Sequence, residues 1–222
     1  MSAIEITARD GEKIGAYLAM PAGTPRGGVV VVQEIFGVND HIRDVCDRMA
    51  QEGYAAIAPA IFDRLEKGFV SGYSPEEVAK ARAFVPRLDW DPCMMDTDAA
   101  REQVAQYGKV GIAGYCLGGT VAFLAATRLP GFSASSCYYG RLIQKYADEI
   151  PACPTQLHYA ALDEGIPAEN YEDVHRRAPA AQFYLYEGAD HGFNCDKRPS
   201  FHPEAAALAW SRTMDMFRVN LG

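Results

Sequence analysis

The sequence has no long apolar run and comparatively little positive charge. No window approaches the roughly 18 uninterrupted apolar residues that span a bilayer, so we expect no membrane partner. The N-terminal stretch carries Glu5, Arg9 and Asp10 where a signal peptide would be apolar, which predicts a cytoplasmic protein. The 21 Lys and Arg residues are outnumbered by 29 Asp and Glu residues, which gives a net charge of -8. Because phosphate-binding surfaces need clustered cations, this balance argues against a nucleic-acid partner.

Disulfide and metal-binding patterns are also missing. None of the cysteines forms a C-x-x-C pair, and no Cys and His residues have the spacing of a zinc site. We therefore expect free thiols in a reducing compartment and neither a metal nor an organic cofactor. The cysteines are Cys46, Cys93, Cys116, Cys137, Cys153 and Cys195.

What is present is an alternation of strands and helices that follows an N-terminal hairpin around Asp10 and Gly11. The first run after the hairpin, GVVVVQE, is apolar and β-branched, as is typical of a parallel strand covered on both faces. Strands are expected at 28–34, 54–60, 109–113, 133–139, 155–161 and 182–186, and helices at 41–53, 74–85, 91–108, 117–128, 167–177 and 203–219. This order predicts an α/β fold with a mostly parallel sheet, in a single domain over 1–222.

The segment KVGIAGYCLGGTVAFLAAT places a cysteine between glycines where a strand meets a helix. This strand–G-x-C-x-G–helix pattern matches a nucleophile elbow with Cys in place of Ser. Side chains at Gly114 and Gly118 would collide with the neighbouring strand and helix. The helix that starts at Leu117 would direct free N–H groups at the sulfur of Cys116 and favour its thiolate. The alternative is a buried structural cysteine in a Gly-rich turn, but the flanking strand and helix favour the nucleophile.

In an elbow enzyme the nucleophile is followed along the chain by an acid and then a histidine. His191 lies in the loop GADHGFN, beyond the carboxyl end of the strand QFYLYEG, and best fits the base. Asp163, at the tip of the strand before, would orient the imidazole and stabilise its cation. Glu164 competes for that role, whereas Asp190 is too close to His191 in sequence to reach its far side.

These segments resemble a known family. QEIFGVN, GYCLGG, ALDEGIP and GADHGF are similar to motifs of the dienelactone hydrolase family of the α/β-hydrolase fold, and the similarity runs over nearly the whole chain. The resemblance implies a mostly parallel sheet of roughly eight strands flanked by helices, without a large lid domain. It also implies hydrolysis of a small-molecule carboxylic ester or lactone, which in this family can carry a free carboxylate.

The resemblance assigns roles to individual residues. Cys116, His191 and Asp163 would form the catalytic triad. Glu34 would rest beside the thiol and move away when substrate binds. The backbone N–H groups of Leu117 and Ile35 would form the oxyanion hole.

The resemblance also implies a site for a substrate carboxylate. Arg64 matches the family arginine that binds this group, although a solvated loop arginine is the alternative. Tyr139, at the end of a strand, is a candidate for lining the pocket, with core packing as the alternative. Cys195 stands where dienelactone-cleaving members carry a second arginine, so half of the expected anion site is missing. Lys197 and Arg198 are near in sequence but need not reach inward.

Two other functions stay open. One is a general carboxylesterase or thioesterase that acts on an uncharged substrate. The other is a non-catalytic binding module on the same fold, which the complete set of Cys116, Asp163 and His191 argues against.

Overall fold

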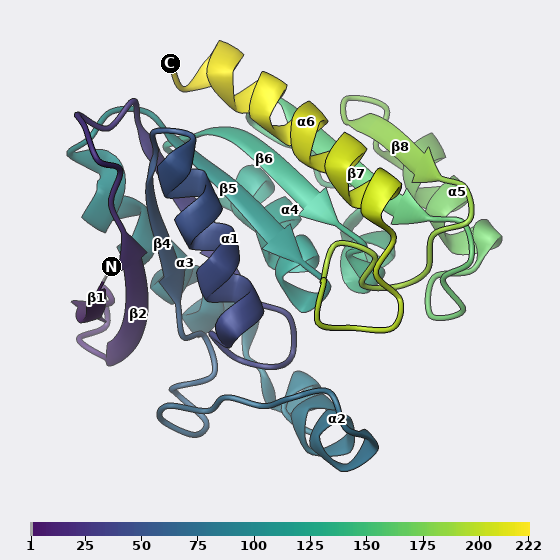
Figure 1. Ribbon diagram of the computed structural model, residues 1–222, viewed down its shortest axis with the longest axis horizontal. Coiled ribbons are helices and arrows are strands. Elements are labelled where there is room, and N and C mark those ends of the chain that lie inside the picture. Colours follow the sequence, from purple (N-terminus) through teal and green to yellow (C-terminus); the bar gives the residue numbers. More distant parts are fainter. Residues whose placement is uncertain (1) are drawn as a thin grey trace.

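An eight-stranded sheet forms the centre of the molecule, as the computed structural model of residues 2–222 shows (Figure 1). The strands are β1 (Ser2–Thr7), β2 (Lys13–Ala19), β3 (Gly28–Val32), β4 (Ala55–Pro59), β5 (Val110–Tyr115), β6 (Phe132–Tyr138), β7 (Thr155–Ala160) and β8 (Gln182–Tyr186). The helices are α1 (Asp40–Gln51), α2 (Pro75–Arg82), α3 (Trp90–Ala105), α4 (Leu117–Arg128), α5 (Ala168–Arg177) and α6 (Pro203–Asn220). Over residues 2–222, no helix is long and apolar enough to cross a membrane.

The strands lie in the order β1-β2-β4-β3-β5-β6-β7-β8. The predicted N-terminal hairpin forms, with β1 antiparallel to β2 and Gly11 at a φ of +88° in the turn. β2 is also antiparallel to β4, and the remaining strands pair in parallel. The predicted α/β fold with a mostly parallel sheet is therefore confirmed.

Helices cover both faces of the sheet. α1 and α6 lie over one face, in front of the strands in Figure 1, and α3, α4 and α5 lie over the other. Contacts agree: the hydroxyl of Tyr138 in β6 is 2.8 Å from that of Thr213 in α6. Tyr159 in β7, which points to the opposite face, lies with its ring 6.2 Å from that of Tyr171 in α5. Because both faces are covered, every residue of β3 is buried, as its unbroken apolar run predicts.

α2 is shorter than the predicted helix over 74–85. It begins with a capping box in which Ser74 and Glu77 each accept from the other's backbone N–H. It ends at Arg82, and the chain tightens into a 3-10 turn at Val85–Arg87, because Pro86 has no N–H to continue the helical pattern.

The parallel strands β3, β4, β5, β6, β7 and β8 all end at one edge of the sheet. In open α/β sheets this edge is where ligands bind, because the loops that follow the strands gather there. The predicted site residues occur in those loops.

Candidate active site

Cys116 lies at a sharp turn between the end of β5 and the start of α4. Its backbone has a φ of 55° and a ψ of -113°, a left-handed conformation that costs a residue with a side chain about 1–3 kcal/mol. A Cβ at Gly114 would collide with the carbonyl oxygen of Gly118, and one at Gly118 with the carbonyl oxygen of Val32. The glycines are therefore required by the close approach of strand, turn and helix, as the sequence pattern predicts.

Three predicted site residues form a hydrogen-bonded chain. The sulfur of Cys116 is 3.2 Å from Nε2 of His191, and Nδ1 of His191 is 2.6 Å from Oδ2 of Asp163. Cys116, Asp163 and His191 follow the carboxyl ends of β5, β7 and β8 in turn, which is the chain order of nucleophile, acid and histidine that an elbow predicts. The structure thus brings together a thiol, an imidazole and a carboxylate in hydrogen-bond reach of one another.

Local hydrogen bonds decide which acid reaches the histidine. Oδ1 of Asp163 accepts from the backbone N–H of Gly165 at 2.8 Å, which leaves Oδ2 for His191. Asp190 is engaged with the backbone N–H of His191 rather than with its ring. Glu164 is exposed at the rim of the neighbouring cavity.

The charges around His191 favour its protonated form. Burial alone would lower the pKa of the imidazole, but the sulfur of Cys116 and the carboxylate of Asp163 on either side together raise it to about 10. A proton that leaves the thiol therefore has an acceptor next to it. The helix dipole of α4, whose first residue follows Cys116 directly, adds positive potential at the sulfur.

Two backbone N–H groups next to the sulfur are free to bind an oxyanion. The N–H of Cys116 donates to Tyr138 at 3.0 Å, and that of Gly118 donates to Gln33 at 3.0 Å. Among residues 2–222, the N–H groups of Leu117 and Ile35 have no such acceptor, and both residues line the cavity that contains the sulfur.

The cavity at this edge has a volume of about 740 Å³. The proposed triad residues Cys116, Asp163 and His191 line it. Four cationic side chains line it as well, namely Arg82, Arg141, Lys145 and Arg198. Three carboxylates, those of Asp163, Glu164 and Asp190, line it too, so its cations outnumber its anions by one in a chain with a net charge of -8.

Arg198 is the site residue that sequence reasoning left undecided. Its side chain is 22% exposed and reaches inward, with its guanidinium 5.8 Å from the ring centre of Phe36 and 6.0 Å from that of Tyr73. Gly192, which has a φ of +80°, leaves room for it, because a Cβ there would collide with the guanidinium. A glycine directly after the histidine, followed within one loop by an arginine, is the sequence signal for this arrangement.

The structure shows Glu34 in a different arrangement from the expected one. The carboxylate is fully buried, and its Oε1 is 3.4 Å from Nη1 of Arg198. The thiol of Cys116 instead has His191 as its hydrogen-bond partner. A buried carboxylate gains more from a nearby guanidinium than from a neutral thiol, which explains the difference.

The prediction that Arg64 faces the pocket is wrong. Its guanidinium donates to Asp96 at 2.9 and 2.7 Å and to Asp10 at 2.7 and 3.0 Å, and it does not line the cavity. Asp96 is completely buried and burial raises its pKa, so it needs a cation beside it. The same guanidinium lowers the pKa of Asp10 to about 2.

The prediction that Tyr139 lines the pocket is also wrong, and its packing alternative describes it better. The side chain is fully buried at a backbone φ of 38°, and its ring lies 5.0 Å from that of His191. Tyr139 is not one of the residues that line the cavity.

The sheet and the strand–cysteine–helix turn together define an α/β-hydrolase. Residues 14–221 match the sequence model of the dienelactone hydrolase family. The chain belongs to that family, and the predicted resemblance is therefore confirmed. Family membership makes the protein a carboxylic ester or lactone hydrolase.

Relatives and solved structures agree with this assignment. A Synechocystis protein named "Putative carboxymethylenebutenolidase" is 38% identical over 229 residues, covering 94% of this chain and 93% of its own length. A Yersinia pestis protein of the same name is 34% identical, covering 93% of this chain and 84% of its own length. The crystal structure titled "Putative Dienelactone Hydrolase" from Klebsiella pneumoniae has a TM-score of 0.84 at 32% identity and covers 98% of both chains.

Proposed function

We propose that the protein cleaves its ester or lactone by covalent catalysis, with Cys116 as nucleophile, His191 as general base and Asp163 as the group that orients the imidazole. The single observation that carries this proposal is the continuous chain of contacts, 3.2 Å from sulfur to Nε2 and 2.6 Å from Nδ1 to the carboxylate. The chain opens on a cavity, where a substrate carbonyl can reach the sulfur.

The reaction proceeds in two halves. In the first, the proton of the Cys116 thiol passes to His191, and the sulfur bonds to the carbonyl carbon. The N–H groups of Leu117 and Ile35 hold the resulting oxyanion. The carbon–oxygen bond then breaks, the leaving oxygen takes the proton from His191, and an acyl-thioester remains.

In the second half, His191 removes a proton from a water molecule that attacks the thioester. The carbon–sulfur bond breaks, the carboxylic acid leaves and the proton returns to the sulfur. A lactone gives one ring-opened hydroxy acid, whereas an open-chain ester gives an alcohol and an acid.

We propose further that the substrate carries a carboxylate and that Arg198 binds it. The guanidinium lines the same cavity as the sulfur, and its partner Glu34 is at 3.4 Å, longer than a strong charge-assisted hydrogen bond. Arg82, Arg141 and Lys145 line the cavity as well, so that with Arg198 its cations outnumber its three carboxylates. Arg198 thus takes the role that the sequence assigned to Arg64.

The mechanism is tested by trapping the acyl-enzyme. Purified protein is mixed with an aryl ester, and the reaction is quenched in acid. The protein is then digested, and its peptides are analysed by mass spectrometry. We expect a mass increase on the peptide that contains Cys116, and a loss of kcat/KM of at least about 10³-fold in Cys116→Ala. Cys153→Ala, which removes a half-buried thiol outside the cavity, is the matched control. Turnover retained by Cys116→Ala would end the nucleophile assignment.

The carboxylate is tested with paired esters that differ only in a free carboxylate. In Arg198→Ala we expect kcat/KM for the charged ester to fall about 10- to 100-fold more than for the neutral one, since a charge-assisted hydrogen bond contributes about 1.5–3 kcal/mol. Arg176→Ala, at an exposed position outside the cavity, is the control. An equal loss on both esters would show that the substrate is uncharged, as for a general esterase.

A further inference from the structure

A second set of cysteine, histidine and carboxylate side chains lies buried at the same end of the sheet. Cys195, His41 and Glu34 each offer one ligand atom, and these atoms all lie within 4.8 Å of one another. All three residues are buried, with His41 at 1% exposure and Glu34 at 0%. We call them the buried Cys–His–Glu set.

Two members of this set have polar atoms without partners. Both ring nitrogens of His41 and Oε2 of Glu34 are buried and make no hydrogen bond within residues 2–222. Leaving a buried polar atom unpaired costs about 1–3 kcal/mol, and more if it is charged. Such atoms gathered at one point are typical of a site built for a ligand that satisfies them together.

We propose that the buried Cys–His–Glu set binds one zinc ion or a cation of similar softness. Thiolate, imidazole and carboxylate are the ligands that zinc takes in proteins, usually four at tetrahedral positions. Tetrahedral zinc with bonds of about 2.0–2.3 Å brings its ligand atoms roughly 3.3–3.8 Å apart. Since the present atoms lie within 4.8 Å of one another, they need to approach by at most about 1–1.5 Å. Magnesium and calcium, which prefer oxygen ligands only, do not suit this set.

The groups around the set are suited to hold its ligands. Sγ of Cys195 is 3.3 Å from the hydroxyl of Tyr73, which also accepts from Nδ2 of Asn39 at 3.0 Å. Once the thiol proton leaves to solvent and the sulfur–metal bond forms, the Tyr73 hydroxyl can donate to the sulfur. The carboxylate of Asp196 is 4.0 Å from Nδ1 of His41 and adds negative charge beside the ion. This charge counters the nearby guanidinium of Arg198.

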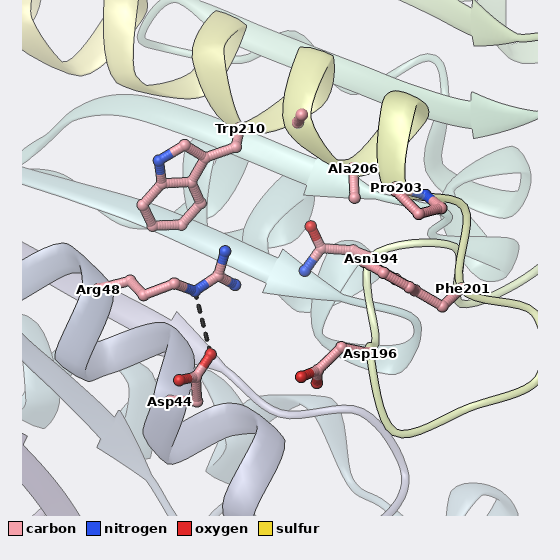
Figure 2. A pocket seen from close by; sticks show the side chains of 9 residues that line it. Asp44, Arg48, Asn194, Asp196, Phe201, Pro203, Ala206 and Trp210 are labelled. Carbon is pink, nitrogen blue, oxygen red and sulfur yellow. Dashed lines mark ion pairs between the residues drawn. The ribbon is translucent and has the colours of Figure 1, made fainter.

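A second cavity lies beside the loop that carries Cys195. It has a volume of about 450 Å³ and is lined by residues of α1, of α6 and of the loop after β8. Figure 2 shows Asn194 and Asp196, the neighbours of Cys195 on either side, extending from that loop toward the cavity. This cavity shares no lining residue with the one that contains Cys116.

The experiment measures zinc binding by isothermal titration calorimetry in the Cys116→Ala background, which removes the sulfur of the proposed active site. We expect one Zn²⁺ per chain, with release of one proton from the Cys195 thiol, detected as a dependence of the heat on the buffer. Cys195→Ser, which keeps a hydrogen bond to Tyr73, should weaken binding by at least about 10-fold. Cys153→Ala is the control variant, and Mg²⁺ is the control cation that we expect not to bind.

Two further readouts keep the result interpretable. Co²⁺ should give a sulfur-to-metal absorption band in Cys116→Ala that disappears when Cys195→Ser is added. Zn²⁺ should also raise the melting temperature, because a ligand that binds only the folded state stabilises it. Binding that persists unchanged in Cys195→Ser would place the ion elsewhere, and absence of Zn²⁺ binding at millimolar concentration would mean that the set holds only water. Either result overturns the proposal, and neither bears on the proposed hydrolysis.

Discussion

The molecule contains two sets that each combine a thiol, an imidazole and a carboxylate, and their surroundings differ. Cys116, His191 and Asp163 form a connected chain of hydrogen bonds that opens on a cavity. The buried Cys–His–Glu set lies in the interior, with unpaired atoms on both His41 and Glu34.

The pKa values of His191 and His41 are shifted in opposite directions. Flanking partners raise the pKa of His191, whereas burial lowers that of His41. The comparison shows that hydrogen-bond partners and solvent access set the properties of these groups, since both sets combine the same three functional groups. We propose proton transfer for the first set and metal binding for the second on the basis of this difference.

The largest effect is expected from changing the acid of the connected set. Asp163→Asn should lower kcat about 10³- to 10⁴-fold at neutral pH, because an amide cannot stabilise the imidazolium and favours the wrong tautomer of His191. Steady-state ester hydrolysis measures it. Glu164→Gln and Asp190→Asn are matched controls, because Glu164 directly follows Asp163 and Asp190 directly precedes His191. A larger loss in either control would assign the acid differently.

The buried histidine should make the fold sensitive to acid. Because the folded-state pKa of His41 lies below its ordinary value of 6.5, the unfolded chain binds a proton first as pH falls, and stability decreases below pH 6.5. One such group contributes up to about 1.4 kcal/mol per pH unit. Replacing the unpaired ring in His41→Phe should therefore flatten the decline in unfolding free energy between pH 6.5 and 5, as measured by urea denaturation.

His158 provides the comparison for that experiment. Burial lowers its pKa to about 3, but its ring nitrogens lie 3.1 Å from Ser136 and 2.7 Å from Tyr186. His158→Phe should flatten the same pH dependence and also cost about 1–3 kcal/mol at neutral pH, because two buried partners lose their hydrogen bonds. An unchanged slope in both variants would contradict the buried, neutral state of these rings.

The smallest effect is expected at Tyr139. Its buried hydroxyl has no partner within residues 2–222, so Tyr139→Phe should leave the unfolding free energy unchanged or raise it by up to about 1 kcal/mol. The hydroxyl of Tyr138, 2.8 Å from Thr213, makes Tyr138→Phe the matched control, with an expected loss of about 1 kcal/mol. A loss in Tyr139→Phe as large as in the control would show that the hydroxyl is satisfied.

The sequence was most informative where function depends on local pattern. The turn at Cys116 could be predicted because the glycine pattern around it is local in sequence, although Gly118 is required by its close approach to Val32 at the end of β3. The order of the strands along the chain pointed to Asp163 and His191. The arginines could not be assigned in this way. Arg64 was predicted to face the pocket because the sequence around it does not reveal its partner. That partner, the buried carboxylate of Asp96, lies on the separate helix α3.

The buried Cys–His–Glu set illustrates the same limit more strongly. Glu34 and His41 are close in sequence, but Cys195 comes from the loop after the last strand. Sequence motifs for metal sites depend on short spacings between ligands. A set whose members come from distant segments and meet only in the folded protein has no such motif. Only the packing of α1 against that loop brings the three ligand atoms together.

The left-handed backbone at Cys116 has a consequence for the durability of the protein. Glycine adopts a φ of 55° without the steric penalty that cysteine bears. Cys116→Gly would therefore relieve local strain while removing the proposed nucleophile. Under the proposed mechanism, the protein gives up some stability at this turn in exchange for activity.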